Sequence, residues 1–215
     1  MNMATQNLDL EEQEQLATLK GWWHDNGNLV LGLVAAAALA VAAWQGWNWY
    51  QRHQGLQASA LYEVLAKGVR SGDAKAVRDA GGALTENFAR TLYASMGALA
   101  SARFHADRGD AKGAKAQLQW VMERSPSDDL RDIARLRLAA LLLDERAYDE
   151  ALRLLEAKHA ETYAAQYAAA RGDVLQAKGQ SAEAKTAYRL ALGKAEAKNE
   201  AFRASVQLRL DALGG

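Results

Sequence analysis

Hydrophobic and polar positions divide the chain into one wholly apolar stretch and a longer region of mixed pattern. From Leu29 to Ala43 no side chain is charged or polar. A helix that starts at Leu29 and continues to Tyr50 rises 1.5 Å per residue and is about 33 Å long, whereas the hydrocarbon core of a bilayer is about 30 Å thick. The pattern therefore predicts a transmembrane helix over 29–50.

Aromatic residues at both ends of this stretch bear on the alternative interpretation, a buried helix in the core of a soluble protein. The rings gather just before the apolar run and again where it closes, at Trp22, Trp23, Trp44, Trp47, Trp49 and Tyr50. Trp and Tyr are enriched at the headgroup level of membranes, whereas core helices do not usually carry Trp clusters at both ends. We therefore favour the membrane span.

Small residues recur every four positions within the predicted span, at Gly32, Ala36 and Ala40. Positions four apart lie on one face of a helix, so these three residues form a ridge with little side chain on it. Lipid gives helices little hydrophobic reason to associate, and close backbone approach through small residues matters more there. The ridge predicts a docking face for a partner's membrane helix; the alternative is that an Ala-rich span contains such a ridge by chance.

After Tyr50 the chain is rich in Ala and charged residues, almost free of Pro, and without a run of alternating β-branched residues. Such a composition predicts helices and no strands. Gly and charge clusters divide the region into segments of helical length. We expect helices over 52–70, 74–85, 91–107, 111–123, 128–144, 148–158, 163–178, 181–198 and 201–213. The short connections predict antiparallel hairpins.

The hairpins repeat. The turns at 72–77, 109–114, 146–151 and 179–184 align at intervals close to the roughly 34-residue period of tetratricopeptide arrays. A Gly at the turn can take the left-handed conformation that ends the first helix, helix A, and a small residue lets the second, helix B, cross closely. The third turn has Arg146 in place of Gly, and the first repeat has Val77 at the small position and Gly81 at the large one.

Residues at the repeat positions are expected to pack the hairpins against each other. They are the small or bulky residues that recur at matching places in the last three repeats: Ala114, Leu118, Ala151, Leu155, Gly172, Gly179, Ala184, Tyr188 and Ala191. Val206, Leu210 and Leu213 share one face of the final segment, which predicts a capping helix at the end of the array. The predicted fold class is all-α: one N-terminal transmembrane helix, then a tetratricopeptide-like α-solenoid of helical hairpins with a C-terminal capping helix.

Charge is balanced overall, with 26 basic and 26 acidic residues, but it is unevenly spread. Lys20 is the only base before the span, against five acids, so the region after the span has a modest positive excess. That excess is too small to predict nucleic-acid binding. The chain has no Cys, hence no disulfide, no thiolate metal site and no thiol nucleophile.

Motifs for chemistry are missing from the sequence. The histidines, His24, His53, His105 and His159, fall in no metal-ligand spacing, and no phosphate-binding or nucleophile motif is present. We therefore predict no enzyme, no cofactor and no metal. Arg131, Arg135 and Arg137 form a basic cluster, which is usually a solvated face and otherwise a clamp for a peptide carboxylate. Tyr163 and Tyr167 line a groove or make a hairpin contact.

Orientation is poorly encoded. The acidic region before the span is not the pattern of a cleaved signal peptide, so we predict an uncleaved anchor. Lys20 on one side and Arg52 on the other nearly balance, with a slight lean toward a cytoplasmic C-terminal side. Within the tail, Leu16, Leu19 and Trp23 recur at helical spacing and predict a short amphipathic helix, and Asn26-Gly27-Asn28 predicts a break before the span.

The segment LKGWWHDNG at 19–27, a single span, GWNW at 46–49 and the Ala-rich helical array together resemble the YfgM family. These are single-span, tetratricopeptide-like ancillary subunits of the bacterial Sec translocon. The resemblance implies an inner-membrane protein with a cytoplasmic acidic tail at 1–28, a span at 29–50 and a periplasmic helical domain at 51–215, and an N-in, C-out topology.

As to function, the resemblance implies association with the Sec channel and with a membrane-anchored periplasmic prolyl isomerase, and chaperone-like handling of secreted or outer-membrane polypeptides. Members of the family are also linked to restraint of an envelope-stress response regulator. The family has no catalytic residues to carry over. The alternative function is a scaffold subunit of another envelope assembly, such as a secretion or cell-division complex.

Overall fold

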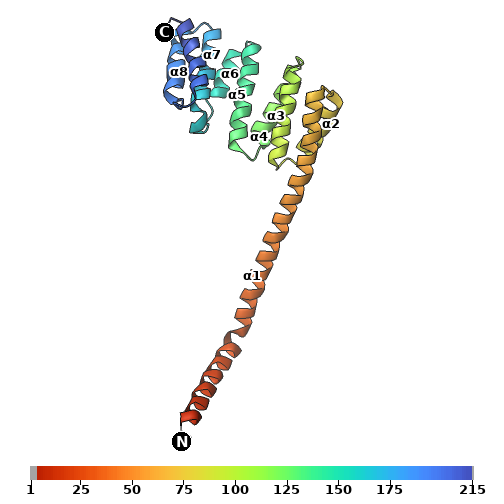
Figure 1. Ribbon diagram of the computed structural model, residues 1–215, viewed down its shortest axis with the longest axis vertical. Coiled ribbons are helices and arrows are strands. Elements are labelled where there is room, and N and C mark those ends of the chain that lie inside the picture. Colours follow the sequence, from red (N-terminus) through yellow and green to blue (C-terminus); the bar gives the residue numbers. More distant parts are fainter. Residues whose placement is uncertain (1–3, 215) are drawn as a thin grey trace. The chain divides into compact units, whose positions relative to one another are not determined.

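The computed structural model describes the backbone of residues 4–214 and the side chains of residues 14–214. Over this range the chain forms α-helices and one short 3₁₀ helix, and no strand, which confirms the all-α prediction. The helices are α1 (Ala4–Ser71), α2 (Ala74–Asn87), α3 (Leu92–Ala106), α4 (Ala111–Arg124), α5 (Asp128–Asp144), α6 (Tyr148–Leu155), η1 (Glu161–Tyr163), α7 (Ala164–Ala177), α8 (Ser181–Lys194) and α9 (Glu200–Ala212) (Figure 1).

Two compact units divide the chain, Met1–His53 and Gln54–Gly215. The helix predicted over 52–70 is not separate, because α1 runs from Ala4 to Ser71. The predicted break at Asn26-Gly27-Asn28 is also wrong. Asn26 Nδ2 donates to the Trp22 carbonyl at 3.1 Å, and the Trp23 indole covers Gly27 so closely that an added Cβ would lie 3.2 Å from Trp23 Nε1. A Gly costs a helix only about 1 kcal/mol, and cooperative helix formation on both sides carries the chain across it.

Within the second unit the helices pair as hairpins: the C-terminal part of α1 with α2, α3 with α4, α5 with α6, and α7 with α8, followed by α9 (Figure 1). Three apolar clusters form the core, and each is built from helices that are neighbours along the chain. A core that passes from one hairpin to the next is the property that makes repeat arrays quasi-one-dimensional. Val206 and Leu210 of α9 are buried in the last cluster, where they cover α7 and α8.

The first repeat tolerates a large residue at its small position because the other helix supplies the small one. Val77 of α2 is buried, and a Cβ added at Gly68 of α1 would lie 3.3 Å from its Cγ2 and 3.0 Å from the Cβ of Ala76. The close crossing is therefore kept, because the small residue lies on helix A and not on helix B.

Two predicted helices end earlier than expected, and tertiary contacts explain both ends. The segment predicted over 148–158 leaves the helix after Leu155, and the backbone N–H of Ala160 donates to Asp132 Oδ2 of α5 at 3.0 Å. The segment predicted over 181–198 ends at Lys194. Arg203 of α9 donates from Nη1 to the Leu192 carbonyl at 2.7 Å, which satisfies a carbonyl in the last turn of α8.

The turns behave alike although their sequences differ. Gly72, Gly109 and Gly179 have φ of 76°, 75° and 85°, and Arg146, at the same place in the third repeat, has φ of 61°. A side chain in this left-handed region costs roughly 1–2 kcal/mol, and Gly avoids the cost. Arg146 therefore adopts an unfavourable conformation because the repeat geometry demands it.

Replacing Arg146 with Gly is expected to stabilise the array. The relief of left-handed strain exceeds the extra backbone entropy of Gly in the unfolded chain, and the expected net gain is about 0.5–1 kcal/mol. Urea unfolding of residues 54–215 measures it, with Arg153→Gly inside α6 as a control that should lose about 1 kcal/mol. A loss of stability in Arg146→Gly would contradict the turn alignment.

Candidate functional site

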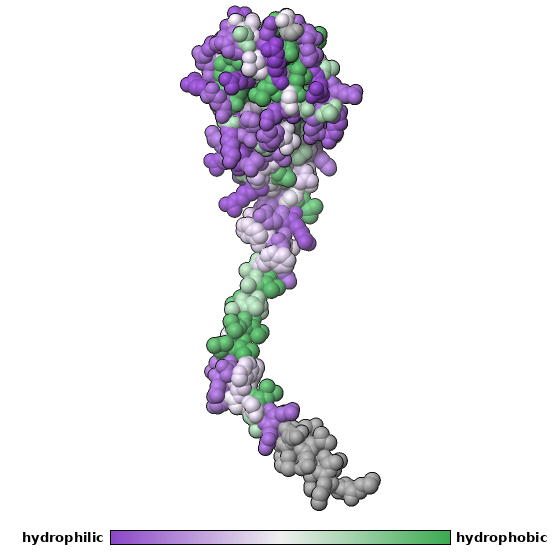
Figure 2. Space-filling model, turned by 90° about the vertical axis from the view of Figure 1, so that its left-hand side faces the viewer, coloured by the Kyte–Doolittle hydropathy of each residue, from purple (hydrophilic) through white to green (hydrophobic). Residues whose placement is uncertain are grey.

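The apolar part of α1 exposes its side chains on every side. Leu29, Leu33, Leu39 and Val41 are each more than half exposed, and the space-filling view shows a hydrophobic band at this level (Figure 2). Among the described residues, one helix is long enough and apolar enough to cross a membrane, and this stretch is part of it. A helix that is apolar all round and uncovered by its own chain needs an apolar medium, and a bilayer supplies one.

Six aromatic residues of α1 lie beyond the ends of this band or at its end, and each is about half exposed or more: Trp22, Trp23, Trp44, Trp47, Trp49 and Tyr50. Trp22 and Trp23 have centroids 6.5 Å apart, and Trp47 and Tyr50 have centroids 6.2 Å apart. Rings with an apolar body and a polar edge suit the depth of the headgroups.

Gly32, Ala36 and Ala40 are exposed and lie one turn apart on α1. A Cβ added at Gly32 would meet no atom within 4 Å in the part of the chain that the structure describes. The ridge is thus bare, as a face must be if another helix is to approach it closely.

Most of the repeat positions lie in the interior of the array, but Gly179 is exposed at its turn, where it provides a left-handed residue and no packing contact. Ala114, Ala151 and Ala184 on the helices B are wholly buried, and the larger residues that follow them, Leu118, Leu155 and Tyr188, are almost or wholly buried, as is Ala191. Leu118, Ala151 and Leu155 belong to one apolar cluster, and Ala184, Tyr188 and Ala191 to another; each cluster joins helices B to helices A and to the next helix.

Gly172 makes the tightest crossing of the last hairpin. A Cβ added there would lie 2.5 Å from Cε1 of Tyr188, closer than real Cβ contacts come. The Tyr188 hydroxyl lies 2.8 Å from Asp173 Oδ1, and Arg209 of α9 donates from Nη1 to Asp173 Oδ2 at 3.1 Å. Burial raises the pKa of Tyr188 and of Asp173, while the Tyr188 hydrogen bond and the Arg209 charge oppose the rise at Asp173. Gly172 and Tyr188 thus join α7 to α8, and the ion pair between Asp173 and Arg209 joins α7 to the capping helix.

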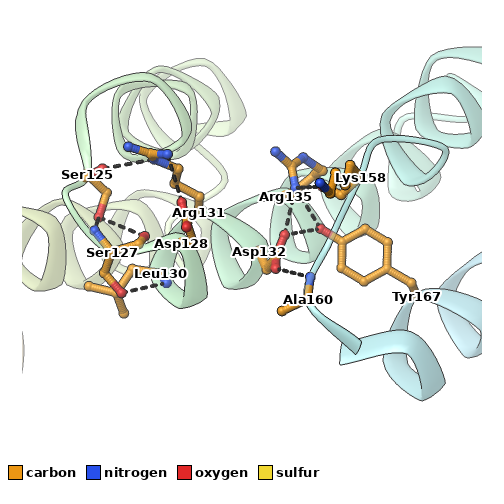
Figure 3. Close-up of polar contacts among 10 residues, drawn as sticks. All are labelled: Ser125, Ser127, Asp128, Leu130, Arg131, Asp132, Arg135, Lys158, Ala160 and Tyr167. Carbon is orange, nitrogen blue, oxygen red and sulfur yellow. Dashed lines mark hydrogen bonds and ion pairs between the residues drawn. The ribbon is translucent and has the colours of Figure 1, made fainter. Parts of the chain in front are cut away.

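A second polar cluster joins α5 to α7 and is drawn in Figure 3. Asp132 accepts from Arg135 Nη1 at 2.7 Å, from the Tyr167 hydroxyl at 2.9 Å and from the Ala160 N–H at 3.0 Å. The His159 ring stacks on Tyr167 with centroids 3.9 Å apart. The Asp132 side chain is 5% exposed and that of Arg135 16%. A buried carboxylate with three donors is satisfied, as burial requires.

Burial raises the pKa of the Tyr167 hydroxyl to about 12, with the nearby Arg135 acting against the rise and Asp132 adding to it. The phenol therefore stays protonated at neutral pH and can donate to Asp132 while it accepts from Arg135 Nη1 at 3.0 Å. The cluster holds α5, the loop before η1 and α7 in one geometry.

This cluster corrects the interpretation of the arginines as a solvated face. Arg137 is exposed, but Arg131 is partly covered and donates from Nε to the Ser125 carbonyl at 2.8 Å, and Arg135 is largely buried. Tyr167 is buried beneath the surface and does not line an open groove. The structure places Asp132 two helical turns before Ala139, which is buried in the core, and so on the same face of α5.

A shallow groove between α3, α4 and α5 has a volume of about 260 Å³. Its floor is formed by small and apolar side chains, and charged ones stand at its rim; the lining residues are Ala102, Arg103, Ala106, Asp107, Leu118, Arg137, Ala140, Leu141 and Asp144. No pattern in the sequence marks this groove, because its residues come from three helices and share no motif. An apolar floor with a charged rim fits a polypeptide side chain better than a small polar substrate.

Chemistry beyond binding has no visible site in the described part of the chain. Between residues 14 and 214 no three His, Asp or Glu side chains come together closely enough to hold a metal ion. His105 Nδ1 lies 2.8 Å from Asp110 Oδ2, a carboxylate that also accepts the Gly113 N–H. That N–H, more than His105, lowers the pKa of Asp110, and both contacts close a turn between α3 and α4.

Comparison with known proteins agrees with this architecture. The family model described as a tetratricopeptide repeat-like domain matches residues 20–215. A relative from Haemophilus influenzae is 30% identical over 182 residues, which cover 83% of this chain and 87% of that protein, and its name is ancillary SecYEG translocon subunit. The chain belongs to the YfgM family.

Further relatives match over 85% or more of their length. One from Neisseria gonorrhoeae is 30% identical over 210 residues, 95% of this chain and 98% of that protein, and one from Escherichia coli is 28% identical over 178 residues, 82% and 85%. Both carry the same name, ancillary SecYEG translocon subunit. Membership of the YfgM family thus rests on the span and the array together, because the matched residues include both.

Proposed function

We propose that this chain is a membrane-anchored ancillary subunit of the Sec translocon whose helical array binds non-native secreted polypeptides and partner chaperones without turning them over. The observation that carries the proposal is the shared name of relatives that match 82–95% of the chain, span and array included. The exposed apolar band of α1 and the groove between α3, α4 and α5 support it. A subunit of a membrane channel needs an apolar band that can span the bilayer, and a protein that binds polypeptides needs a groove.

The experiment that tests the proposal uses photo-crosslinking in native membranes. A photoreactive residue replaces Ala140, exposed in the groove, and in a matched chain it replaces Glu150, exposed on α6. We expect nascent or unfolded secreted polypeptides to be captured at position 140, with little capture at position 150, and the Sec channel to co-purify with both chains. Capture of components of a different envelope assembly, with no Sec channel, would favour the scaffold alternative and overturn the proposal.

For location we propose the bacterial inner membrane, with a cytoplasmic N-terminal tail, a span at 29–50 and a periplasmic domain at 51–215. The resemblance to the family implies this orientation and the mild cationic pull of Lys20 supports it, while the local count of flanking bases leans weakly the other way. A reporter that needs periplasmic oxidation, fused after Gly215, should be active. Activity of only a cytoplasmic reporter at that position would reverse the topology.

Partners in the membrane are proposed to dock on the small-residue ridge of α1, Gly32, Ala36 and Ala40. The candidates are the Sec channel and the anchor of the periplasmic prolyl isomerase, and a stress-response regulator is a further proposed contact. Ala36→Leu keeps the span hydrophobic but holds a partner backbone away, so recovery of the membrane partner from detergent should fall severalfold. Val34→Leu, off the ridge, is the matched control and should leave recovery unchanged. Equal recovery would show that the span is a generic anchor.

A further inference from the structure

Arg52 follows the apolar span and has no carboxylate within reach along the chain. The sequence contains no Asp or Glu between Asp25 and Glu63. Glu63 comes about three helical turns after Arg52, whereas ion pairs on a helix join residues three or four positions apart. In the part of the chain that the structure describes, the exposed guanidinium of Arg52 forms no hydrogen bond and no ion pair. A counter-ion for Arg52 therefore has to come from outside the chain.

The place of Arg52 beside the apolar band decides which anions surround it. The band closes with Trp44, Trp47, Trp49 and Tyr50, whose rings suit the level of the headgroups, and Arg52 follows Tyr50 by two residues. A long basic side chain near the end of a span extends its charged group outward to the interface. The anions held at that depth are the phosphates of phospholipids. A lipid phosphate is therefore the counter-ion that the position of Arg52 favours.

The residues around Arg52 on α1 leave room for a lipid. The Trp49 and His53 rings stack with centroids 5.4 Å apart and only 6° between their planes, and both side chains are exposed. Trp49 lies one turn before Arg52, and Gly46 one turn before Trp49, so the three share one side of the helix. A Cβ added at Gly46 would meet no atom within 4 Å in the described structure. The backbone is thus bare at Gly46, directly below a flat aromatic wall.

We infer that this side of α1, formed by Gly46, Trp49, Arg52 and His53 and called here the Arg52 face, binds the headgroup of an anionic phospholipid. Arg52 holds the phosphate, because a guanidinium presents parallel N–H donors to phosphate oxygens. The stacked rings flank the glycerol, and the acyl chains pass the bare backbone at Gly46. A zwitterionic lipid brings its own ammonium group, which competes with Arg52 for the phosphate, so the face favours a lipid with net negative charge.

The full-length chain in phosphatidylcholine bicelles at low salt tests this inference. In one titration phosphatidylglycerol replaces phosphatidylcholine stepwise, and in a second inorganic phosphate is added to bicelles of phosphatidylcholine alone. NMR follows the indole N–H of Trp49, identified by its loss in Trp49→Phe, and the Nε–H of Arg52. We expect both resonances to shift saturably with phosphatidylglycerol and to stay in place with inorganic phosphate, which separates a lipid headgroup from a free anion.

Variants separate a site from diffuse attraction to a charged surface, with the Trp49 resonance as the readout. Arg52→Gln should raise the phosphatidylglycerol fraction at half-saturation about fivefold, as the loss of one base at an anionic surface implies. Arg70→Gln removes the same charge from the last turn of the same helix and should leave the titration unchanged. Gly46→Leu keeps every charge but fills the space beside the rings, and it should weaken binding as well.

Three results would overturn the inference: equal shifts with phosphatidylglycerol and inorganic phosphate, no saturation with phosphatidylglycerol, or equal effects of Arg52→Gln and Arg70→Gln. An unchanged titration in Gly46→Leu would show attraction without a site and would overturn it too. The inference goes beyond the proposed function, because it concerns the lipid around the span and not the polypeptides that the array binds. Crosslinking at position 140 and recovery of the Sec channel are measured separately, so the lipid site and the proposed function fail independently.

Discussion

Replacing Asp132 with Ala is expected to destabilise residues 54–215 by about 3–5 kcal/mol, the cost of breaking a buried ion pair by removing one partner. The Arg135 charge, 16% exposed, would lose its carboxylate, and the Tyr167 hydroxyl and the Ala160 N–H would lose their acceptor. Because the cluster joins α5 to the loop before η1 and to α7, the loss should also raise amide exchange at Ala160. Urea unfolding and hydrogen exchange measure the two effects.

Asp128→Ala is the matched control for this prediction. It removes the same group from the same helix, but Asp128 is 86% exposed and its ion pair with Arg131 is a surface one. Such pairs contribute about 0–1 kcal/mol, so the control should lose no more than about 1 kcal/mol. Tyr167→Phe, which keeps the ring and its stacking on His159, should lose about 1–2 kcal/mol. Similar small losses in Asp132→Ala and Asp128→Ala would show that the cluster does not stabilise the array.

The second large effect is expected from a single methyl group, in Gly172→Ala. Its Cβ would lie 2.5 Å from the ring of Tyr188, which is wholly buried and whose hydroxyl lies 2.8 Å from Asp173. The ring cannot move aside without leaving that contact or displacing the backbone of α8. We expect a net loss of about 1–3 kcal/mol, since overpacking outweighs the higher helix propensity of Ala.

Gly82→Ala in α2 provides the comparison, because a Cβ there meets no atom within 4 Å in the described structure. That variant should gain about 0.5–1 kcal/mol from helix propensity alone. We therefore expect urea unfolding to show a lower free energy of unfolding for Gly172→Ala and a higher one for Gly82→Ala. A gain in both would mean that α7 and α8 have room to separate and that Tyr188 does not set their distance.

Parts of the candidate site could be predicted from sequence, and parts could not. The apolar band, its aromatic ends and the ridge at Gly32, Ala36 and Ala40 are local along the chain, so periodicity and composition are enough to find them. The groove that contains Ala140 could not be found in this way. Its lining comes from helices up to about 40 residues apart, and no spacing rule connects such positions.

What the sequence determined by itself is the class of the protein and the order of its elements. An uncharged run from Leu29 to Ala43 has few stable environments, and Ala-rich segments between turns at 72–77, 109–114, 146–151 and 179–184 favour helix hairpins at a fixed period. Helix propensity and the tendency to be buried depend mainly on residue type, so the span and the hairpins could be predicted from the sequence.

Only the tertiary structure shows where a residue adopts a conformation or an environment that its type disfavours. Arg146 takes a left-handed turn that its type disfavours, Gly68 makes room for Val77, and Arg203 ends α8 at Lys194. Asp132 lies on the buried face of α5 because Arg135, Tyr167 and Ala160 satisfy it there. In each case the contact that offsets the local cost comes from another turn or another helix, and only the folded chain brings those groups within bonding distance.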